Sequence, residues 1–513
     1  MTGPSAPAAP GGRPAGFLGY VAARGDWLAA AAGALLAAAF APVGAWPLAF
    51  ACPAILMLAW RDATPRVAAR RGFLFTAATF LAGTYWLYHS IHLIGQAPVW
   101  IALVLMLGMV SIMGAYTALL GWAVVRHGPA PGALRHLVVV PAGYVLVEWL
   151  RGWLFSGFPW LALGYTQLDT GLAAWAPAGG VYAVGLAVAV LAGAIVTMIT
   201  GGRAARAAAA VAVIAVCGSA AVLRTVEWTQ PEPRTVTVAL VQGAVPQTMK
   251  WAPGQLERTM DLYRTLSQPY LGANIIVWPE SAIPTLESNV RDYLDAVSRT
   301  AAASGSALIT GLVRREPGTG NYYNSIAAWS PDEQWYYKRR LVPFGEFFPV
   351  PSAVREWMRL MNLPYSDFAA GPDDQRPLEA AGERLAPTIC YEDAYGTEQR
   401  ALAHASTLLV NVTNDAWFGD SSAPHQHLDI SRMRSLETGR PMLRATNDGV
   451  TALIAHDGTV IAALPQFVPG VLTGRLTPRT GDTPYVRHGN VPVLVLMLLG
   501  LAAGVVARRR SGA

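Results

Sequence analysis

The stretch that organises this chain is LAPTICYED, residues 385–393. An apolar run suited to a buried strand ends in Cys390, and Tyr391, Glu392 and Asp393 follow directly. A thiol at the end of a buried strand, beside carboxylates, lies where a pocket can form at a sheet edge. Because a nucleophilic thiol needs a base or a nearby cation, the rest of the sequence should supply both.

Two other stretches place such groups just after predicted strands. NIIVWPESAIP, residues 274–284, contains Glu280, and YYKRRLVPFGEFFP, residues 336–349, contains Lys338 and Glu346. Singly, each residue has an ordinary interpretation: a small buried Cys, a solvated turn Glu, and a Lys on a solvated or lipid-facing basic patch. Together, a Glu, a Lys and a Cys match the base, cation and nucleophile of covalent catalysis.

The composition indicates a membrane protein. Hydrophobic residues make up 53% of the 513 residues and charged residues 14%, against about 25% charged in ordinary soluble domains. The mean hydropathy is +0.34. The net charge of +6 is modest, and without a basic stripe interleaved with aromatics we expect no nucleic-acid partner. The three cysteines, Cys52, Cys217 and Cys390, form no disulfide framework or paired-Cys metal motif.

Apolar runs predict about eight membrane spans. They cover residues 27–41, 43–60, 72–93, 98–125, 136–154, 178–200, 205–223 and 491–506. A crossing helix needs about 20 apolar residues, so the first run is the weakest candidate. The resulting domains are a disordered cytoplasmic tail (1–24), a membrane domain with seven transmembrane helices (25–224), an extracytoplasmic catalytic domain (225–490), an eighth transmembrane helix (491–507) and a cytoplasmic tail (508–513).

The distribution of Arg among the loops predicts the orientation. Arg residues follow the second, fourth, sixth and eighth runs: Arg61, Arg66, Arg70, Arg71, Arg126, Arg135, Arg203, Arg206, Arg508, Arg509 and Arg510. The loops APVGAW and IGQAP, after the first and third runs, contain neither Lys nor Arg. This alternation predicts that both termini lie in the cytoplasm and that residues 225–490 lie outside it.

Polar and aromatic residues mark the outer end of the fifth run. Glu148 and Arg151 are spaced i, i+3 and share a helix face. Ionisable residues at membrane depth are often functional, but a structural ion pair near the outer surface is the favoured interpretation. Trp153, Phe158 and Trp160 suit an aromatic belt at the membrane interface, beside an entry path for lipid.

Residues beyond Arg234 alternate like strands. Strand-like runs cover residues 235–242, 275–278, 307–312, 323–329, 385–390, 407–412 and 450–456, and helix-like segments cover 255–266 and 290–303. Strands mixed with helices predict one α/β or α+β domain with a buried sheet.

Two features leave alternatives open. His425 and His427 form an H-x-H pair, but no further ligand cluster accompanies them, which favours packing or hydrogen bonding over metal binding. The apolar stretch 347–363 follows Glu346 directly. It is either core or a mobile lid that touches lipid, and the sequence does not favour one over the other.

The order WPES, YYKRRLVPFGEFFP, ICYED and NVTNDAWFG resembles the nitrilase, or carbon–nitrogen hydrolase, superfamily. With the apolar runs, nearly all of residues 20–507 resembles the apolipoprotein N-acyltransferase family, and LETGRPMLRATNDG, residues 436–449, is also similar to it. The resemblance implies a polytopic α-helical membrane protein with an inserted αββα nitrilase-like α/β domain, located in the bacterial inner membrane. It implies no cofactor and no metal.

The resemblance also implies roles for named residues. Glu280 would be the general base, Lys338 would stabilise the oxyanion and Cys390 would be the nucleophile. The supporting or substrate-binding residues would be Trp251, Glu346, Tyr391 and Glu392. In the implied ping-pong reaction a phospholipid, typically phosphatidylethanolamine, acylates Cys390. The N-terminal amine of a diacylated apolipoprotein then takes the acyl chain in the final step of lipoprotein maturation.

Two other functions remain compatible with the residues alone. A membrane-tethered amidase would use the same three side chains, with water instead of an amine resolving the thioester. A transporter or non-catalytic scaffold would leave them inert. Few charges within the apolar runs, and no pair of Gly/Pro-broken runs that would mark an inverted repeat, argue against the transporter.

Overall fold

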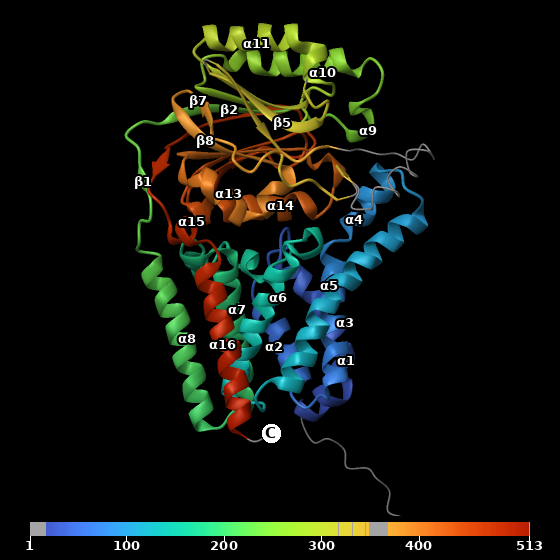
Figure 1. Cartoon of the computed structure of the whole chain (residues 1–513), viewed down its shortest axis with the longest axis vertical. Coiled ribbons are helices and arrows are strands. Elements are labelled where there is room, and N and C mark those ends of the chain that lie inside the picture. Colours follow the sequence, from blue (N-terminus) through green and yellow to red (C-terminus); the bar gives the residue numbers. More distant parts are fainter. Residues whose placement is uncertain (1–16, 317, 331, 344, 348–367, 512–513) are drawn as a thin grey trace, which may run out of the picture.

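A helical bundle and an α/β sandwich are stacked along the long axis of the computed structural model (Figure 1). The structure describes residues 17–316, 318–330, 332–343, 345–347 and 368–511. Apart from Phe347, the stretch predicted as either lid or core lies outside these residues, so that question stays open. The end of α16 (Val491–Arg510), near the C-terminus, lies at the end of the bundle farthest from the sandwich.

Each of the eight predicted apolar runs overlaps a helix of the bundle. These helices are α1 (Phe17–Leu36), α2 (Leu48–Trp60), α3 (Pro65–Gly83), α5 (Val99–His127), α6 (Val140–Arg151), α7 (Ala176–Thr200), α8 (Arg203–Leu223) and α16. A short helix, α4 (Trp86–Tyr88), follows α3. Since α1 begins at Phe17, part of the range 1–24 that the sequence predicts as a tail is helical.

Four segments in the described part of the chain are long and apolar enough to cross a membrane. They are Val99–His127, Gly171–Thr200, Arg203–Leu223 and Val491–Arg510. The expectation of about eight spans is therefore supported only for these four. Helix α2 has 13 residues, about 20 Å at 1.5 Å per residue, against a hydrocarbon core of about 30 Å. Helix α3 carries three Arg residues in its first turns.

Two six-stranded sheets form the centre of the sandwich. One has the order β13 (Gly470–Leu476), β2 (Val236–Gln242), β3 (Ile275–Trp278), β4 (Ala307–Arg315), β5 (Tyr322–Trp329) and β6 (Glu333–Tyr337). The other has the order β12 (Val460–Ala463), β11 (Ala452–Ile454), β10 (Met442–Thr446), β9 (Leu408–Thr413), β8 (Glu383–Ile389) and β7 (Leu378–Ala380). In each, three central strands are parallel and the outer strands antiparallel.

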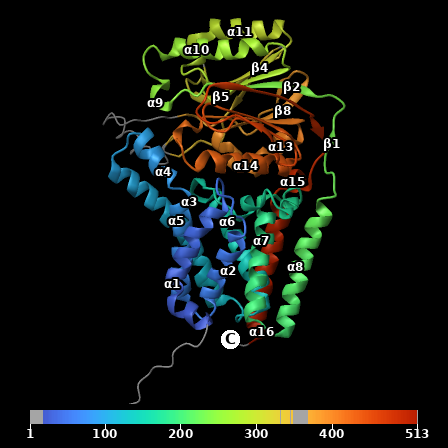
Figure 2. The same ribbon diagram turned by 180° about the vertical axis from the view of Figure 1, so that it is seen from behind.

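Helices cover both outer faces of the paired sheets, which gives the four-layer αββα order that the resemblance implies (Figures 1 and 2). Helices α10 (Gln255–Ser267) and α11 (Arg291–Ala303) cover the first sheet. Helices α13 (Gly396–His404) and α14 (Ala423–Thr438) lie between the second sheet and the bundle. The first and last segments of the sandwich sequence pair with each other, as β1 (Gln230–Pro231) and β14 (Arg479–Thr480). Helix α15 (Pro484–His488) then leads into α16.

Strand β3 shows why the sequence folds into these layers. Ile275 and Val277 belong to the core shared between the sheets, whereas Ile276 and Trp278 belong to the core under α10 and α11. Successive side chains of a strand point to opposite faces. A central parallel strand covered on both faces must therefore be apolar throughout, which is what the run IIVW provides.

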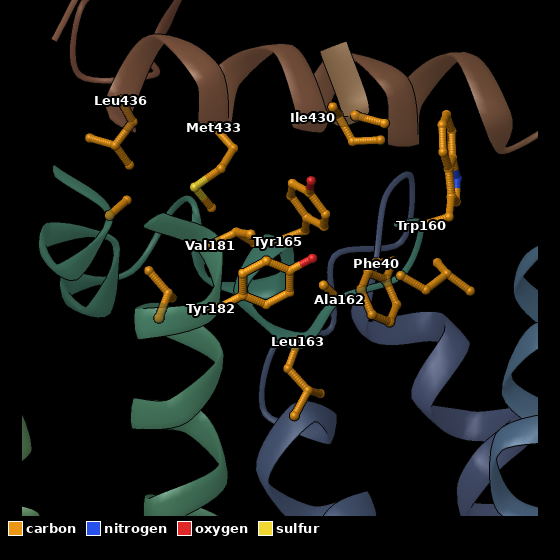
Figure 3. Close-up of a cluster of buried hydrophobic side chains, with 14 of the residues drawn as sticks. Phe40, Trp160, Ala162, Leu163, Tyr165, Val181, Tyr182, Ile430, Met433 and Leu436 are labelled. Atoms are coloured by element: carbon orange, nitrogen blue, oxygen red, sulfur yellow. The ribbon is translucent and has the colours of Figure 1, made fainter. Parts of the chain in front are cut away.

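Helix α14 docks onto the bundle through an apolar seam (Figure 3). Ile430, Met433 and Leu436 recur at helical spacing along the helix and are buried. They face Tyr165 and Val181 from the bundle side. Because α14 has its other face toward the second sheet, this one helix is part of the sandwich core and of the contact with the bundle.

The ion pair predicted in the fifth run is present. Arg151 Nη2 lies 3.4 Å from Glu148 Oε1, and both side chains are buried. Arg151 also donates to the peptide oxygens of Trp160, at 2.8 Å, and Leu161, at 3.0 Å. The pair therefore fixes the segment after α6. Trp160 is only 2% exposed, so its predicted place in an interfacial belt is wrong, whereas Trp153 is 47% exposed.

Gln426, in the first turns of α14, joins the sandwich to the bundle by hydrogen bonds. Its Oε1 accepts from the indole nitrogens of Trp160, at 2.7 Å, and Trp86, at 3.2 Å. Its Nε2 donates to the peptide oxygen of Gly83 at 3.1 Å. One side chain thus satisfies groups from three separate places in the bundle.

Gln426→Leu is expected to destabilise the whole protein. The change leaves the indole N–H groups of Trp86 and Trp160 buried without their acceptor, at about 1–3 kcal/mol each. Thermal unfolding in detergent measures the loss, with Gln255→Leu as the matched control because the Gln255 amide bonds within its own helix, to Thr259. A Leu variant that melts at the wild-type temperature would show that the hydrogen bonds of Gln426 do not contribute to stability.

Candidate active site

Three strands end where the predicted catalytic side chains begin. Glu280 follows β3 by one proline, Lys338 follows β6 directly, and Cys390 follows β8 directly. All three side chains are buried, with Lys338 only 1% exposed. The structure therefore places the Glu, the Lys and the Cys in buried positions that immediately follow their strands.

A hydrogen-bonded cluster holds the cation against two carboxylates. Lys338 Nζ lies 2.9 Å from Glu346 Oε1 and 3.4 Å from Glu280 Oε1. Asn324 Nδ2, from β5, donates to the same two oxygens, at 2.8 Å and 2.6 Å. Glu346 therefore contacts Lys338 directly and Glu280 through Asn324.

Glu280 is fixed from several sides. Its Oε2 accepts from the backbone N–H of Asn414 at 2.8 Å, and its peptide oxygen accepts from Lys250 Nζ at 3.3 Å. The backbone of Glu280 packs tightly against β4: a Cβ on Gly311 would lie 2.6 Å from the Cα of Glu280. Only glycine leaves room there, so Gly311 allows the carboxylate loop to sit on the sheet.

Cys390 adopts a left-handed backbone conformation, with φ of 51°. Such a conformation costs about 1–2 kcal/mol in a non-glycine residue and recurs at functional sites. Burial and the nearby Glu280 carboxylate raise the pKa of the thiol well above its ordinary value, which Lys338 offsets only in part. The resting group is therefore a thiol, which would need a base in order to act as a nucleophile.

Lys338 remains a cation despite its burial. Burial alone would lower the pKa of its ammonium group, but Glu346 and then Glu280 outweigh that effect and hold the pKa above its ordinary value. A fixed positive charge in a water-poor site stabilises a developing oxyanion more strongly than it would in water.

Glu392 ties two of the catalytic strand ends together. Its Oε1 accepts from the backbone N–H of Arg339 at 2.6 Å, next to Lys338, and its Oε2 accepts from that of Ile389 at 2.8 Å, next to Cys390. Burial raises the pKa of Glu392 to about 7. Its place in the structure is that of a positioning residue.

Tyr391 connects the segment around Cys390 to the bundle. Its hydroxyl donates to the peptide oxygen of Gly157 at 3.2 Å, and its ring stacks on Trp160 with centroids 6.4 Å apart. The residue after Cys390 thus touches the segment that follows α6.

Sequence comparison assigns the family. The model of the apolipoprotein N-acyltransferase N-terminal domain matches residues 32–194, and the carbon–nitrogen hydrolase model matches residues 237–485. The apolipoprotein N-acyltransferase of Methylococcus capsulatus is 40% identical over 491 residues, covering 95% of this chain and 96% of the relative. The chain belongs to the apolipoprotein N-acyltransferase family.

Other members of the family are similarly close. The apolipoprotein N-acyltransferase of Azotobacter vinelandii is 41% identical over 498 residues, covering 95% of this chain and 96% of the relative. That of Pseudomonas syringae pv. tomato is 39% identical over 495 residues, covering 95% and 97%. A carbon–nitrogen hydrolase superfamily protein of Xanthomonas campestris, a solved structure, is 18% identical, with a TM-score of 0.35, covering 52% of this chain and 97% of that chain.

Within this apolipoprotein N-acyltransferase family member, Trp251 stands apart from the catalytic cluster. It follows α9 (Gln247–Lys250) and is 56% exposed. The hydrogen bonds of the described residues do not join its side chain to Glu280, Lys338 or Cys390. Its role in substrate binding stays a prediction, and an exposed indole beside the Lys250 anchor is compatible with it.

The H-x-H pair of this family member serves hydrogen bonding. His425 Nε2 lies 3.0 Å from Gln466 Nε2, whereas His427 contacts Asp415 and the peptide oxygen of Cys390. Among the described residues, no group of three or more His, Cys, Asp or Glu side chains is placed to hold a metal ion.

Three residues of the site were not predicted from the sequence. Asn324 lies within a strand and carries no motif of its own. Asn414 lies in the NVTNDAWFG motif, which the sequence marks without assigning the residue a part. Lys250 directly precedes Trp251 in the sequence. It is buried, which lowers the pKa of its ammonium group to about 8, and it donates to the peptide oxygen of Glu280.

Asp448 is expected to make stability depend on pH. Burial and then Asp415 raise its pKa to about 7, while Lys250 opposes the shift. Between its ordinary value of 3.8 and about 7, the folded protein holds a proton that the unfolded chain has lost. Stability from this group is therefore full at low pH and falls as pH rises through 7, by at most about 1.4 kcal/mol per pH unit.

Thermal midpoints of the wild type and Asp448→Asn, taken from pH 5 to pH 8, check this expectation. The variant should show the flatter decline because its amide does not titrate. Parallel curves would contradict the assignment, since other buried carboxyls are common to both proteins.

Proposed function

We propose that this protein transfers an acyl chain from a phospholipid to the N-terminal amine of a diacylated apolipoprotein through a thioester on Cys390. Membership of the apolipoprotein N-acyltransferase family supports N-acylation of lipoproteins. The single observation that carries the proposal is the Lys338 ammonium held between Glu280 and Glu346. The Cys390 thiol lies beside this cluster, and Tyr391, the next residue, contacts the bundle.

In the first half-reaction, Glu280 takes the thiol proton as Sγ attacks the ester carbonyl of the phospholipid. Lys338 stabilises the negative oxygen of the tetrahedral state. The carbon–oxygen bond of the ester then breaks, and Glu280 returns the proton to the leaving oxygen. The products are a Cys390 thioester and a lysophospholipid, with phosphatidylethanolamine as the proposed donor.

In the second half-reaction, Glu280 removes a proton from the incoming ammonium group, because only a neutral amine can attack. The nitrogen of the diacylglyceryl-cysteine adds to the thioester carbonyl, and Lys338 again meets the negative oxygen. The carbon–sulfur bond breaks, and Glu280 gives the proton that it took from the ammonium group to the sulfur. The nitrogen loses its second proton to solvent, which leaves the amide and the free thiol. Trp251, at the exposed end of α9, is the proposed contact for a substrate chain.

The test uses purified full-length protein, phosphatidylethanolamine and a synthetic diacylated lipopeptide, with products analysed by mass spectrometry. A triacylated peptide supports the proposal. Free fatty acid with an unchanged peptide would instead show that water resolves the thioester, as in an amidase. No acyl adduct and no product would refute both enzymatic functions.

We further propose that the catalytic domain, residues 225–490, lies on the outer side of the bacterial inner membrane. We also propose that α1, α2, α3 and α6 span the membrane and complete an eight-helix membrane domain within residues 25–224 and 491–507. In support, the connection between α7 and α8 lies at the end of the bundle opposite the sandwich, as does the end of α16 (Figure 1). These segments carry Arg203, Arg206 and Arg508–Arg510, and Arg-rich segments favour the cytoplasmic side.

A reporter that is active only in the cytoplasm, fused after residue 230, is expected to be silent. The same reporter fused after residue 510 should be active and serves as the control. Activity at residue 230 would reverse the proposed orientation.

A further inference from the structure

His427, on α14, has both ring nitrogens against hydrogen-bond acceptors. Its Nε2 lies 3.2 Å from the peptide oxygen of Cys390, and its Nδ1 lies 2.9 Å from Oδ1 of Asp415. A neutral imidazole has one N–H donor and one acceptor nitrogen, so it can satisfy only one of these contacts. The doubly protonated ring satisfies both.

The charges around the ring call for the same protonation state. Asp415 Oδ2 lies 3.0 Å from Arg444 Nη2, and Asp393 Oδ2 lies 3.8 Å from Arg444 Nη1. All of these side chains are fully buried. With a neutral His427 the cluster holds one cation against two carboxylates, and a buried unbalanced charge is costly. An imidazolium balances it.

The hydroxyl groups of the cluster are already committed as donors to the carboxylates. Thr388 Oγ1 donates to Asp393 Oδ1 at 2.7 Å, and Ser431 Oγ donates to Asp393 Oδ2 at 2.5 Å. Asp415 Oδ2 also pairs with the guanidinium of Arg444, a permanent cation, which favours the ionised form of this carboxyl. The proton between Asp415 and His427 therefore belongs to the ring.

From this arrangement we infer that His427 is a positioning residue, an imidazolium that bonds the peptide oxygen of Cys390 to Asp415 and so aims the thiol at Glu280 and Lys338. It acts through the backbone of Cys390, whose φ of 51° directs the side chain away from the path of β8. Trp160, whose ring centroid lies 5.8 Å from that of His427, packs against the imidazole from the bundle side.

Two variants separate the two contacts. The side-chain nitrogen of Gln falls near the position of Nε2, and that of Asn falls near Nδ1. His427→Gln therefore keeps a donor for Cys390, and His427→Asn keeps a donor for Asp415. Replacing the charged donor to Cys390 by a neutral one corresponds to about fivefold, whereas a nucleophile displaced by about 1 Å can lose about 100-fold.

The kinetic readout rests on the proposed function, so two rates are measured for Cys390. One is acylation by phosphatidylethanolamine, followed by intact mass, and the other is alkylation by iodoacetamide, followed on the Cys390 peptide. We expect His427→Gln to stay within about fivefold of wild type and His427→Asn to be about 100-fold slower. Both variants should melt lower than wild type by a similar amount, because each removes the imidazolium from the buried cluster. His425→Asn, two residues away on the same helix, is the matched control and should match wild type.

Equal rates in the Gln and Asn variants, or a faster Asn variant, would overturn the inference. So would a folded Gln variant that is about 100-fold slower than wild type, which decides the matter even where the Asn variant does not fold. A wild type that gains no acyl adduct would refute the proposed function instead, and the iodoacetamide rates would still test His427.

Discussion

Cys390→Ser is expected to lose at least about 10³-fold in transfer activity and to form no acyl-enzyme. The serine hydroxyl has a similar shape, but it is a far poorer nucleophile than sulfur without a matched base. The Glu280 carboxylate that serves the thiol is also bonded to Asn414, Asn324 and Lys338.

Intact mass after incubation with phospholipid alone measures this directly. The wild type should gain one acyl chain, which neutral hydroxylamine should remove because it cleaves thioesters. Cys217→Ser is the matched control, since Cys217 is exposed on α8 and far along the chain from the site. An adduct that persists in Cys390→Ser, or turnover without an adduct under trapping conditions, would rule out the covalent route.

Lys338→Met is expected to slow both half-reactions by about 10²–10³-fold. Met keeps the length of the side chain but removes the ammonium group from the developing oxyanion. The change also leaves Glu280 and Glu346 buried without the cation between them. We therefore expect the acylation rate to fall with little change in the KM for phospholipid.

Arg340→Met is the matched control for Lys338→Met. Arg340 belongs to the same basic run, but its side chain is half-exposed and pairs with Glu398. Single-turnover acylation should be near wild type in Arg340→Met and strongly reduced in Lys338→Met. Equal losses in the two variants would favour the interpretation of this run as a lipid-facing basic patch.

The positions of Glu280 and Cys390 could be predicted because each follows an apolar strand, whereas Lys338 stands out through its motif YYKRRLVPFGEFFP. Strand β3 has the predicted bounds, 275–278, and Cys390 follows β8 as the run LAPTI suggests. The four layers follow from the resemblance. Strands β6, β7, β10, β12 and β13 were not predicted. Polar residues interrupt β6, Arg444 lies at the centre of β10, and β12 is only partly buried.

The connections between distant residues could not be predicted from local patterns. Asn324 belongs to the site only because β5 pairs beside β4, and its amide reaches two carboxylates at once. Trp160 looks like an interfacial aromatic in sequence, yet Gln426, far along the chain, provides its buried acceptor. The H-x-H spacing suggests that His425 and His427 bind the same partner, but His425 contacts Gln466 and His427 contacts Asp415.

The docking of α14 on the bundle limits which segments can be exchanged between relatives. A chimera that joins this sandwich to another bundle would leave Ile430, Met433 and Leu436 against a foreign surface, and Tyr391 without the peptide oxygen of Gly157. The segment 153–167, although it belongs to the bundle by sequence, is complementary to the sandwich. Recombination points placed before residue 153 and after Gln167 would transfer it together with the sandwich that it fits.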